Sequence, residues 1–560
     1  MDFFIAASKI NAGDVVIDPS MYVYPQCLVD GQVLTQGRAE KLSDPDEPPP
    51  GLEPGVVSLL SEINQVLKEE SRTIKDVFPY PEQVLGTFLQ RVFQQSLQQN
   101  LESVLAKTET LSPLAFLRTL QASRAAVISL AEDLKTHGLT EHPDPLSTTT
   151  TVLLDQNVEE LFVPYLQDRG YLDSERESLD QLYSSLLLKF TLYHSQRKKV
   201  ANLGVLDRFK KTRERAIGKV LDSDLGKSQS EALSRIIGLD RRPGSGDGVD
   251  LKDSDGLLSV DFAKRMLKWL AEAVGRALEL SVSSDTPKDV HALMIILIEH
   301  MSTLYLDIAL DAALDAAESQ KGAPDLTYLH SLRPTTQIMH LMFAFINTAL
   351  VPLSQTSLTT RREMAKLSTA ALKSLETKIN TLIQRTVTTT TTYLALLLSK
   401  QKKAEYRPKD DEVSLTTLNT PTCLTIQTFL SRLQETAAES LDGANRDNFL
   451  DEVGAGFRSL LLDHLKKFQV NQAGAIMLSK DITVYRDAVE AWKVGSLRDG
   501  FELLYEIGNL FVVGPQALRE RMRDGVLAKV KPGYLRGYLV KREDYQSAGI
   551  EKIVSTLPGG

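Results

Sequence analysis

Apolar residues recur at steps of three and four along most of this chain of 560 residues. Stripes of this kind run through Val56, Leu59, Leu60, Ile63 and Leu67, through Phe262, Met266, Leu270, Val274 and Leu278, and through Phe449, Val453, Phe457, Leu460, Leu461 and Phe468. This spacing places each set on one side of a helix. No segment alternates apolar and polar residues over the length of a strand, and no fixed-period repeat is visible. The sequence therefore predicts an all-α protein.

The length of the chain predicts several helical bundles, because a single hydrophobic core stops growing at about 250–300 residues. Amphipathic helices joined by short loops bury their stripes against neighbours, so we expect an elongated rod of stacked antiparallel bundles. The β-branched run Thr386–Thr392 is expected to bend or fray its helix. The predicted parts are an irregular segment at 1–55, bundles at 56–200, 257–400 and 421–560, a charged and glycine-rich linker at 201–256, and a polar loop at 401–420.

Charge and hydropathy limit the class of protein. The formal net charge of −9 argues against a general nucleic-acid binder, which needs a basic surface to displace counterions from phosphates. The longest strongly apolar run, Ala292–Ile298, is far shorter than the ~20 residues of a membrane-spanning helix. The first residues lack the basic and apolar regions of a signal peptide. We therefore expect a cytoplasmic protein with at most peripheral membrane contact.

No motif predicts catalytic residues, a metal or a cofactor. The glycine-rich run Gly244–Gly248 is not followed by the Gly-Lys-Ser of a phosphate-binding loop. Asp253-Ser-Asp255-Gly256 is similar to part of a calcium loop, but Leu251 and Phe262 stand where that loop needs carboxylates. The two cysteines lie far apart, and no two histidines have the spacing of a zinc hydrolase. His464 lies beside an apolar stripe, where a satisfied or surface histidine is expected and a pH switch is the alternative.

One stretch of the chain is locally basic. Between residues 197 and 219 only Asp207 and Glu214 oppose the positive side chains. A function in binding anionic lipid headgroups is one interpretation, and a solvated helix face or a contact with an acidic partner is the other. The candidate residues are Arg197, Lys198, Lys199, Arg208, Lys210, Lys211, Arg213 and Arg215.

The order of several short stretches resembles the Sec-ten subunit family of the exocyst. Most distinctive is Leu161-Phe-Val-Pro-Tyr165, a proline-marked helix end, with Tyr171, Glu175, Arg176, Leu179, Leu182 and Tyr183 after it. The others are Val77–Pro79, Phe88–Gln95, Leu114–Leu117, Asp255–Leu258, Arg265–Trp269, Leu510–Pro515 and Arg542–Tyr545. Each is a packing pattern, and their collinear order from about 56 to 550 carries the resemblance.

The resemblance implies a non-catalytic scaffold that tethers secretory vesicles to the plasma membrane before SNARE-driven fusion. It also implies assembly with other exocyst subunits, especially the fifteen-numbered subunit, which provides an indirect link to a Rab GTPase. Members of the family begin with a coiled-coil helix, whereas residues 1–55 show no heptads. The alternative is a recyclin-type adaptor in endocytic recycling, which shares the helical region and carries an F-box ahead of it.

Overall fold

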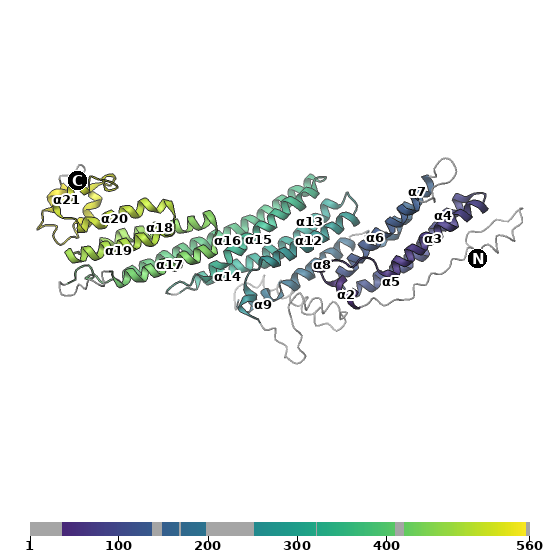
Figure 1. Cartoon of the computed structure of the whole chain (residues 1–560), viewed down its shortest axis with the longest axis horizontal. Helices are drawn as coiled ribbons and strands as arrows, with labels where there is room; N and C mark the ends of the chain where they lie inside the picture. Colours follow the sequence, from purple (N-terminus) through teal and green to yellow (C-terminus); the bar gives the residue numbers. More distant parts are fainter. Residues whose placement is uncertain are drawn as a thin grey trace, which may run out of the picture. The chain divides into compact units, whose positions relative to one another are not determined.

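The computed structural model describes residues 36–136, 148–166, 170–197, 251–320, 322–408 and 419–555. These ranges consist of helices and their connections, with one isolated bridge between Val470 and Arg542 and no strand (Figure 1). The predicted all-α class is confirmed for this part of the chain. Contacts group the chain into two compact units: unit 1 comprises residues 1–305 and 341–370, and unit 2 comprises residues 306–340 and 371–560.

Unit 1 is built mainly from helices before residue 305, and α5 and α6 pack along each other within it. The 3-10 and π-helical turns carry the prefix η. Its elements are α2 (Gln36–Ser43), α3 (Pro54–Val77), α4 (Pro81–Arg91), η2 (Val92–Leu97), α5 (Gln98–Glu109), α6 (Pro113–Thr136), α7 (Thr148–Leu166), α8 (Gly170–Leu186), α9 (Leu188–Arg197), η3 (Asp253–Gly256), α12 (Val260–Leu280), α13 (Thr286–Leu297), most of η4 (Ile298–Leu306), η6 (Ile346–Leu350) and η7 (Val351–Ser354).

Unit 2 contains most of the remaining helices, while α15 (Leu332–Phe345) and α16 (Leu358–Ser399) contribute residues to both units. Helices α19 and α20 pack closely, since a Cβ added at Gly508 would lie 2.6 Å from Ile482 Cδ1. The elements of unit 2 are α14 (Asp307–Glu318), η5 (Thr327–Ser331), α17 (Pro421–Ser440), α18 (Gly443–Leu465), α19 (Gln472–Glu490), η9 (Gly495–Leu497), α20 (Arg498–Val512), α21 (Pro515–Arg521), η10 (Leu527–Lys529), α22 (Pro532–Leu539) and α23 (Ile550–Ser555).

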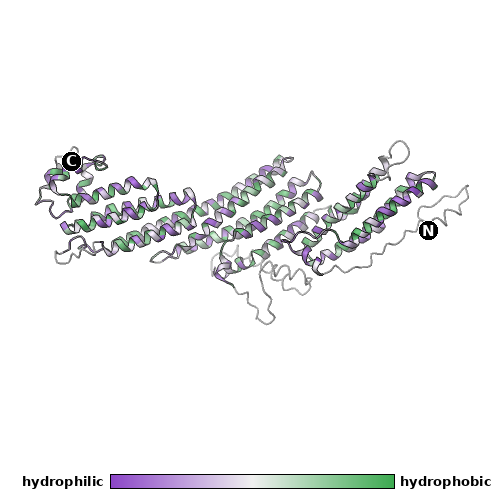
Figure 2. Ribbon diagram, in the orientation of Figure 1, coloured by the Kyte–Doolittle hydropathy of each residue, from purple (hydrophilic) through white to green (hydrophobic). Residues whose placement is uncertain are grey.

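Most residues of the predicted apolar stripes are buried in the cores of the two units, but Leu278, a residue of the second stripe, is 46% exposed near the end of α12. In α3, all five residues of the first stripe, Val56 to Leu67, are buried. Figure 2 shows hydrophobic and hydrophilic residues interleaved along the helices, as expected when each helix has one buried and one wet face. Prolines begin α3, α4, α6, α17, α21 and α22, where a missing N–H costs no helical hydrogen bond.

Two local predictions are wrong. The segment 1–55 is predicted to be irregular, and its residues 1–35 lie outside the described residues, but Gln36–Ser43 form α2, which packs on α6 through buried Ala39 and Leu42. The threonine run Thr386–Thr392 was expected to bend or fray, but α16 continues through it. The hydroxyls of Thr386, Thr388, Thr389 and Thr391 bond back to carbonyl oxygens four residues earlier, as Thr386 Oγ1 does to Leu382 at 2.8 Å, and Thr386 is fully buried.

Two helical runs are long and apolar enough to cross a membrane by length and composition alone. They are Thr286–Glu318 and Thr327–Ser354, and 78% and 22% of their most apolar windows are buried inside the protein. A buried core helix of a globular protein passes the same test, so the two runs are weak evidence for a membrane span. The search for uninterrupted apolar stretches in the sequence did not identify these two runs. In the first run, the apolar stretch Ala292–Ile298 is interrupted by Glu299 and His300.

The predicted division into bundles at 56–200, 257–400 and 421–560 stays a prediction, as does the rod. Within unit 1, helices from both sides of residues 201–256 pack together, since α8 contacts α12 and α13. The predicted linker lies outside the described residues from 201 to 250, and its last residues form η3.

Candidate interaction sites

The predicted basic stretch starts at a well-anchored residue. Arg197 ends α9, and its guanidinium lies 3.2 Å from Asp253 Oδ1 and 4.6 Å from the centre of the Tyr193 ring. Its side chain is 67% exposed, so it is available to a partner. The other candidate residues, Lys198, Lys199, Arg208, Lys210, Lys211, Arg213 and Arg215, lie outside the described residues.

The contacts between α9 and η3 hold residues 197 and 251 near each other in unit 1. Tyr193 Oη donates to Asp253 Oδ1 at 3.0 Å, and His194 Nε2 lies 3.0 Å from the carbonyl oxygen of Gly256. Asp255 accepts from the backbone N–H of Lys252. The two aspartates of the calcium-like sequence thus hold neighbouring groups. In the described part of the chain, no group of three or more His, Cys, Asp or Glu side chains is placed to hold a metal ion.

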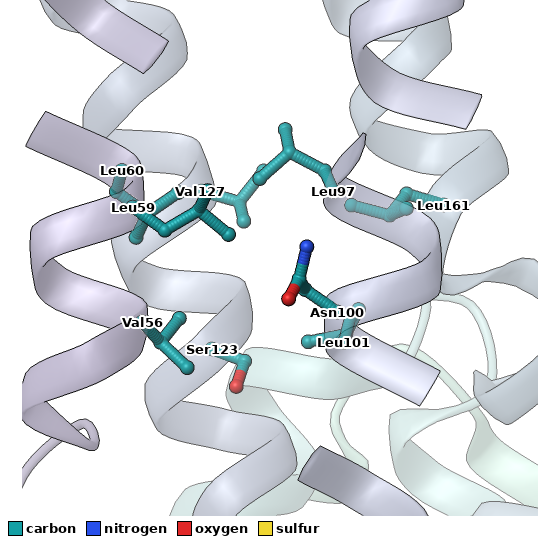
Figure 3. Close-up of a pocket in the computed structure, with 9 residues that line it drawn as sticks. All are labelled: Val56, Leu59, Leu60, Leu97, Asn100, Leu101, Ser123, Val127 and Leu161. Carbon is teal, nitrogen blue, oxygen red and sulfur yellow. The ribbon is translucent and has the colours of Figure 1, made fainter. Parts of the chain in front are cut away.

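A small cavity lies among α3, η2, α5, α6 and α7 (Figure 3). Its volume is about 10 Å³, which is room for one water molecule. Two polar side chains, Asn100 and Ser123, face it among aliphatic ones, and Ser123 Oγ is buried without a hydrogen-bond partner among the described residues. The cavity is too small for a substrate or cofactor. The remaining lining residues are Val56, Leu59, Leu60, Leu97, Leu101, Val127 and Leu161.

A buried ion pair joins α8 and α12 in unit 1. Arg276 Nε and Nη2 donate to the two carboxylate oxygens of Glu175 at 2.7 and 2.9 Å, and Tyr171 Oη donates to Glu175 at 2.9 Å. The side chains of Glu175 and Arg276 are 0% and 4% exposed. Burial lowers the pKa of Arg276, but the Glu175 carboxylate outweighs it, and the net pKa is raised. This is a two-point pair of the kind that fixes side-chain geometry.

Arg118 on α6 fastens the N-terminal segment to unit 1. Its Nη1 donates to the carbonyl oxygens of Lys41, Leu42 and Asp44, and its Nη2 donates to Glu47 O and to the Glu272 carboxylate. The Arg118 side chain is 1% exposed, and desolvation lowers its pKa despite the nearby Glu272. We call residues 36–51 the N-terminal latch.

Helix α12 binds the side chain of Asp46 in the latch. Arg265 Nη2 lies 2.6 Å from Asp46 Oδ2, and Trp269 Nε1 donates to Asp46 Oδ1 at 3.2 Å. Lys268 Nζ donates to the carbonyl oxygen of Asp46 at 3.0 Å. With Arg118, these three side chains form a surface that we call the latch platform: Arg118, Arg265, Lys268 and Trp269.

Unit 2 buries a carboxylate against neutral donors. The Asp481 side chain on α19 is fully buried, and it accepts from Tyr406 Oη at 2.8 Å and from Thr420 through both the backbone N–H at 3.0 Å and Oγ1 at 2.6 Å. Asn419 completes the set at 3.3 Å. Desolvation raises the pKa of Asp481 even though these hydrogen bonds favour its ionised form. The arrangement ties residues 406 and 419–420 to α19.

His464 is the satisfied histidine that its position predicted. It is 5% exposed, its Nε2 lies 2.8 Å from Gln401 Oε1, and its ring packs against Phe468. Desolvation and the nearby Lys467 lower its pKa to about 4. The imidazole is therefore neutral at physiological pH.

Two stretches that carry the family resemblance meet near the C-terminus. Arg542 Nη1 donates at 2.6 Å to the carbonyl oxygens of both Leu510 and Val513, at the end of α20. The same guanidinium pairs with Asp544 at 2.7 Å. The closing Arg-x-Asp-Tyr pattern thus secures the end of the apolar run that precedes Pro515.

Sequence reasoning missed Arg276 and Asp481 as buried charges, and it used Glu175 only as part of the resemblance. A signal was present, since each occurs beside buried apolar residues of its helix. Asp481 lies between Leu478 and Ile482, both buried. A charge on a predicted apolar stripe therefore indicates a buried polar contact, although its partner comes from another helix.

Comparison with known proteins gives a consistent result. A family model described as "Exocyst complex component Sec10-like, alpha-helical bundle" matches residues 5–554. The chain is 26% identical over 553 residues to exocyst complex component SEC10 of Saccharomyces cerevisiae, covering 88% of this chain and 62% of that protein. It is 26% identical over 600 residues to SEC10b of Arabidopsis thaliana, with coverages of 98% and 65%. It is 24% identical over 489 residues to exocyst complex component 5 of Homo sapiens, with coverages of 86% and 63%. The chain thus spans less than two thirds of the length of these relatives.

Proposed function

This chain belongs to the Sec10-like family of exocyst components, and from that membership we propose that it is a non-catalytic scaffold subunit of an exocyst complex. The observation that carries the proposal is the family match over residues 5–554, which confirms the resemblance predicted from the sequence. The yeast, plant and human relatives are all named as exocyst components and give the recyclin-type alternative no support.

The charges buried in the described structure contribute to packing within each unit. The buried charges Glu175, Arg276 and Asp481 are engaged in hydrogen bonds between elements of their own unit.

The finer parts of the proposal follow from the resemblance. The chain assembles with the other exocyst subunits, in particular with the fifteen-numbered subunit, which provides the indirect link to a Rab GTPase. It acts in the cytoplasm at plasma-membrane sites of exocytosis, where the complex holds secretory vesicles before SNARE-mediated fusion. Its contribution is a set of helical surfaces that hold partners in place.

Affinity purification of the tagged chain from its own cells, followed by mass spectrometry, tests this proposal. Recovery of the other exocyst subunits in similar amounts supports it. Recovery of Skp-type and cullin proteins without exocyst subunits would instead assign the chain to the recycling adaptors.

We also propose that the basic stretch from Arg197 to Arg215 contacts an acidic surface, with anionic lipid headgroups as the first candidate. Because Tyr193 and Arg197 both bond to Asp253, residues 198–250 can be replaced by a short Gly/Ser linker without separating α9 from η3. Sedimentation with phosphatidylserine vesicles should fall in this variant and in one with the seven basic residues from Lys198 to Arg215 reversed to glutamate, in which Arg197 is kept because it pairs with Asp253. Unchanged sedimentation, or equal binding to phosphatidylcholine, would exclude the lipid and leave an acidic protein as the partner.

A further inference from the structure

Most contacts between the N-terminal latch and the latch platform involve the main chain of the latch. Within the latch, Arg118 donates to carbonyl oxygens and to no side chain, and Lys268 donates to the carbonyl oxygen of Asp46. The carbonyl oxygens of Lys41 and Leu42 belong to the last turn of α2, where they have no N–H partner within the helix, so Arg118 caps this helix end whatever its side chains are. The platform therefore recognises mainly the backbone of the bound segment and does not require one particular sequence.

Selectivity comes from a few positions. Leu42 and Pro45 are buried, and the Asp46 carboxylate lies between Arg265 and the indole N–H of Trp269. The next residues, Glu47 to Pro49, are exposed. The platform thus selects a short helix end with apolar anchors and a carboxylate directly after them.

The latch leaves hydrogen-bonding capacity unused. The Nε atoms of Arg118 and Arg265 are both buried, and neither has a hydrogen-bond partner among the described residues. A buried donor without a partner is destabilising, because it has lost its hydrogen bonds to water. A segment with an additional carboxylate or carbonyl at these atoms would bind the platform better than the latch does.

The latch can leave without unfolding a long element. Its only helix is α2, with eight residues, and helices this short are not stable alone. After residue 51 the chain enters α3 at Pro54, so the core helices keep their contacts when the latch detaches. Local opening of such segments takes less free energy than global unfolding.

We propose that the latch platform is a binding site for an acidic segment of a partner protein, and that the N-terminal latch occupies this site in the free chain. Three positive charges of the platform, on Arg118, Arg265 and Lys268, face one carboxylate of unit 1, Glu272. The excess positive charge is complementary to an acidic segment such as Asp44–Glu47. This proposal concerns a site within unit 1 and holds whether or not the chain is an exocyst subunit.

The test uses a fluorescein-labelled peptide of residues 38–51 and the full chain. The latch is weakened by Leu42→Ser with Asp46→Lys, which leaves the platform intact. The peptide should bind the latch-weakened chain at least tenfold more tightly than the wild type, because the tethered latch competes at a high effective concentration. Absence of binding to both proteins, or equal binding to both, overturns the proposal.

A charge exchange separates binding from folding. For this test the latch carries Leu42→Ser with Asp46→Ser, so that the tethered latch holds no lysine that could pair with a new glutamate. Arg265→Glu in that chain should lower peptide affinity at least tenfold, and a peptide carrying Asp46→Lys should restore it. Trp269 emission in a Trp492→Phe background checks that unit 1 is folded. Loss of affinity without restoration counts against recognition at Asp46. Concentration-dependent dimerisation of the wild type, abolished by the latch substitutions, would make a second copy the occupant and overturn the proposal of a partner.

Discussion

Unit 1 and unit 2 bury carboxylates in different surroundings. Glu175 in unit 1 meets the guanidinium of Arg276 at two points, while Asp481 in unit 2 meets only neutral donors from Tyr406, Thr420 and Asn419. Both carboxylates are fully buried. The same helical architecture therefore tolerates a buried acid with a cation or with hydrogen bonds alone. The two solutions differ in what happens when one partner or one proton is removed.

The two tryptophans of the sequence allow each unit to be followed separately. Trp269 lies in unit 1 and Trp492 in unit 2, and both are buried. Urea unfolding of a Trp492→Phe chain reports on unit 1, and unfolding of a Trp269→Phe chain reports on unit 2. These two backgrounds separate the stability of one unit from that of the other.

Breaking the paired charges of unit 1 should have the largest effect. Glu175→Leu leaves Arg276 buried without its carboxylate, and removal of one member of a buried pair costs about 3–5 kcal/mol. Urea unfolding followed by Trp269 measures the loss. The double variant Glu175→Leu with Arg276→Met is the control and should recover most of the stability. A double variant as unstable as the single one would show that the pair's charge is not the cause.

Acid should destabilise unit 2 through His464. Because its folded pKa is about 4 and an unfolded histidine titrates near 6.5, the unfolded chain binds the proton more tightly in this range. Stability is then complete above about pH 6.5 and falls by up to about 3 kcal/mol as the pH drops to 4. His464→Gln, which keeps a neutral amide beside Gln401, should abolish this loss. Parallel pH profiles of the Trp492 transition in variant and wild type would refute the assignment.

Asp481 should give unit 2 a pH dependence of the opposite sign. Its folded pKa is raised, so the folded chain binds the proton more tightly than the unfolded chain does. Stability is therefore highest below about pH 3.9 and decreases as the pH rises toward the folded pKa, at no more than about 1.4 kcal/mol per pH unit. Urea unfolding midpoints measured from pH 4 to 7 in a His464→Gln background isolate the contribution of Asp481 to the stability of unit 2. Asp481→Asn should flatten the profile, and an unchanged slope would contradict the account.

A half-exposed pair in unit 1 should matter least. Lys68 Nζ lies 2.8 Å from Asp133 Oδ2, with the two side chains 27% and 35% exposed. Pairs of this kind contribute about 0–1 kcal/mol because water and salt screen them. Lys68→Gln should change the Trp269 transition by no more than this. If Lys68→Gln lowered the free energy of unfolding as much as Glu175→Leu does, buried and exposed ion pairs would not differ in their contribution to stability.

The helical class and many core residues were predictable because each helix encodes its own buried face. The stripe from Val56 to Leu67 gives the inner side of α3 without reference to any other helix. The latch was less predictable. Residues 36–43 have too few apolar positions to define a helix, and what fixes them is Arg118, more than seventy residues away in the chain.

Contacts between helices set the remaining limits. The pairing of Glu175 with Arg276 spans about a hundred residues, and no local pattern links the two. At Thr386, contacts that the sequence does not reveal stabilise a structure that the local sequence disfavours. Its low helix propensity predicted a bend, but a hydroxyl bond to Leu382 and another to Tyr328 outweigh that propensity.

The central claim is that this chain is a stoichiometric scaffold of an exocyst complex, and purification through a different subunit tests it most directly. The complex is isolated from cells by a tag on another exocyst component, and each chain is quantified by mass spectrometry. The account predicts this chain in an amount equal to that of the other subunits. A complex that contains all the other subunits and lacks this chain would contradict it.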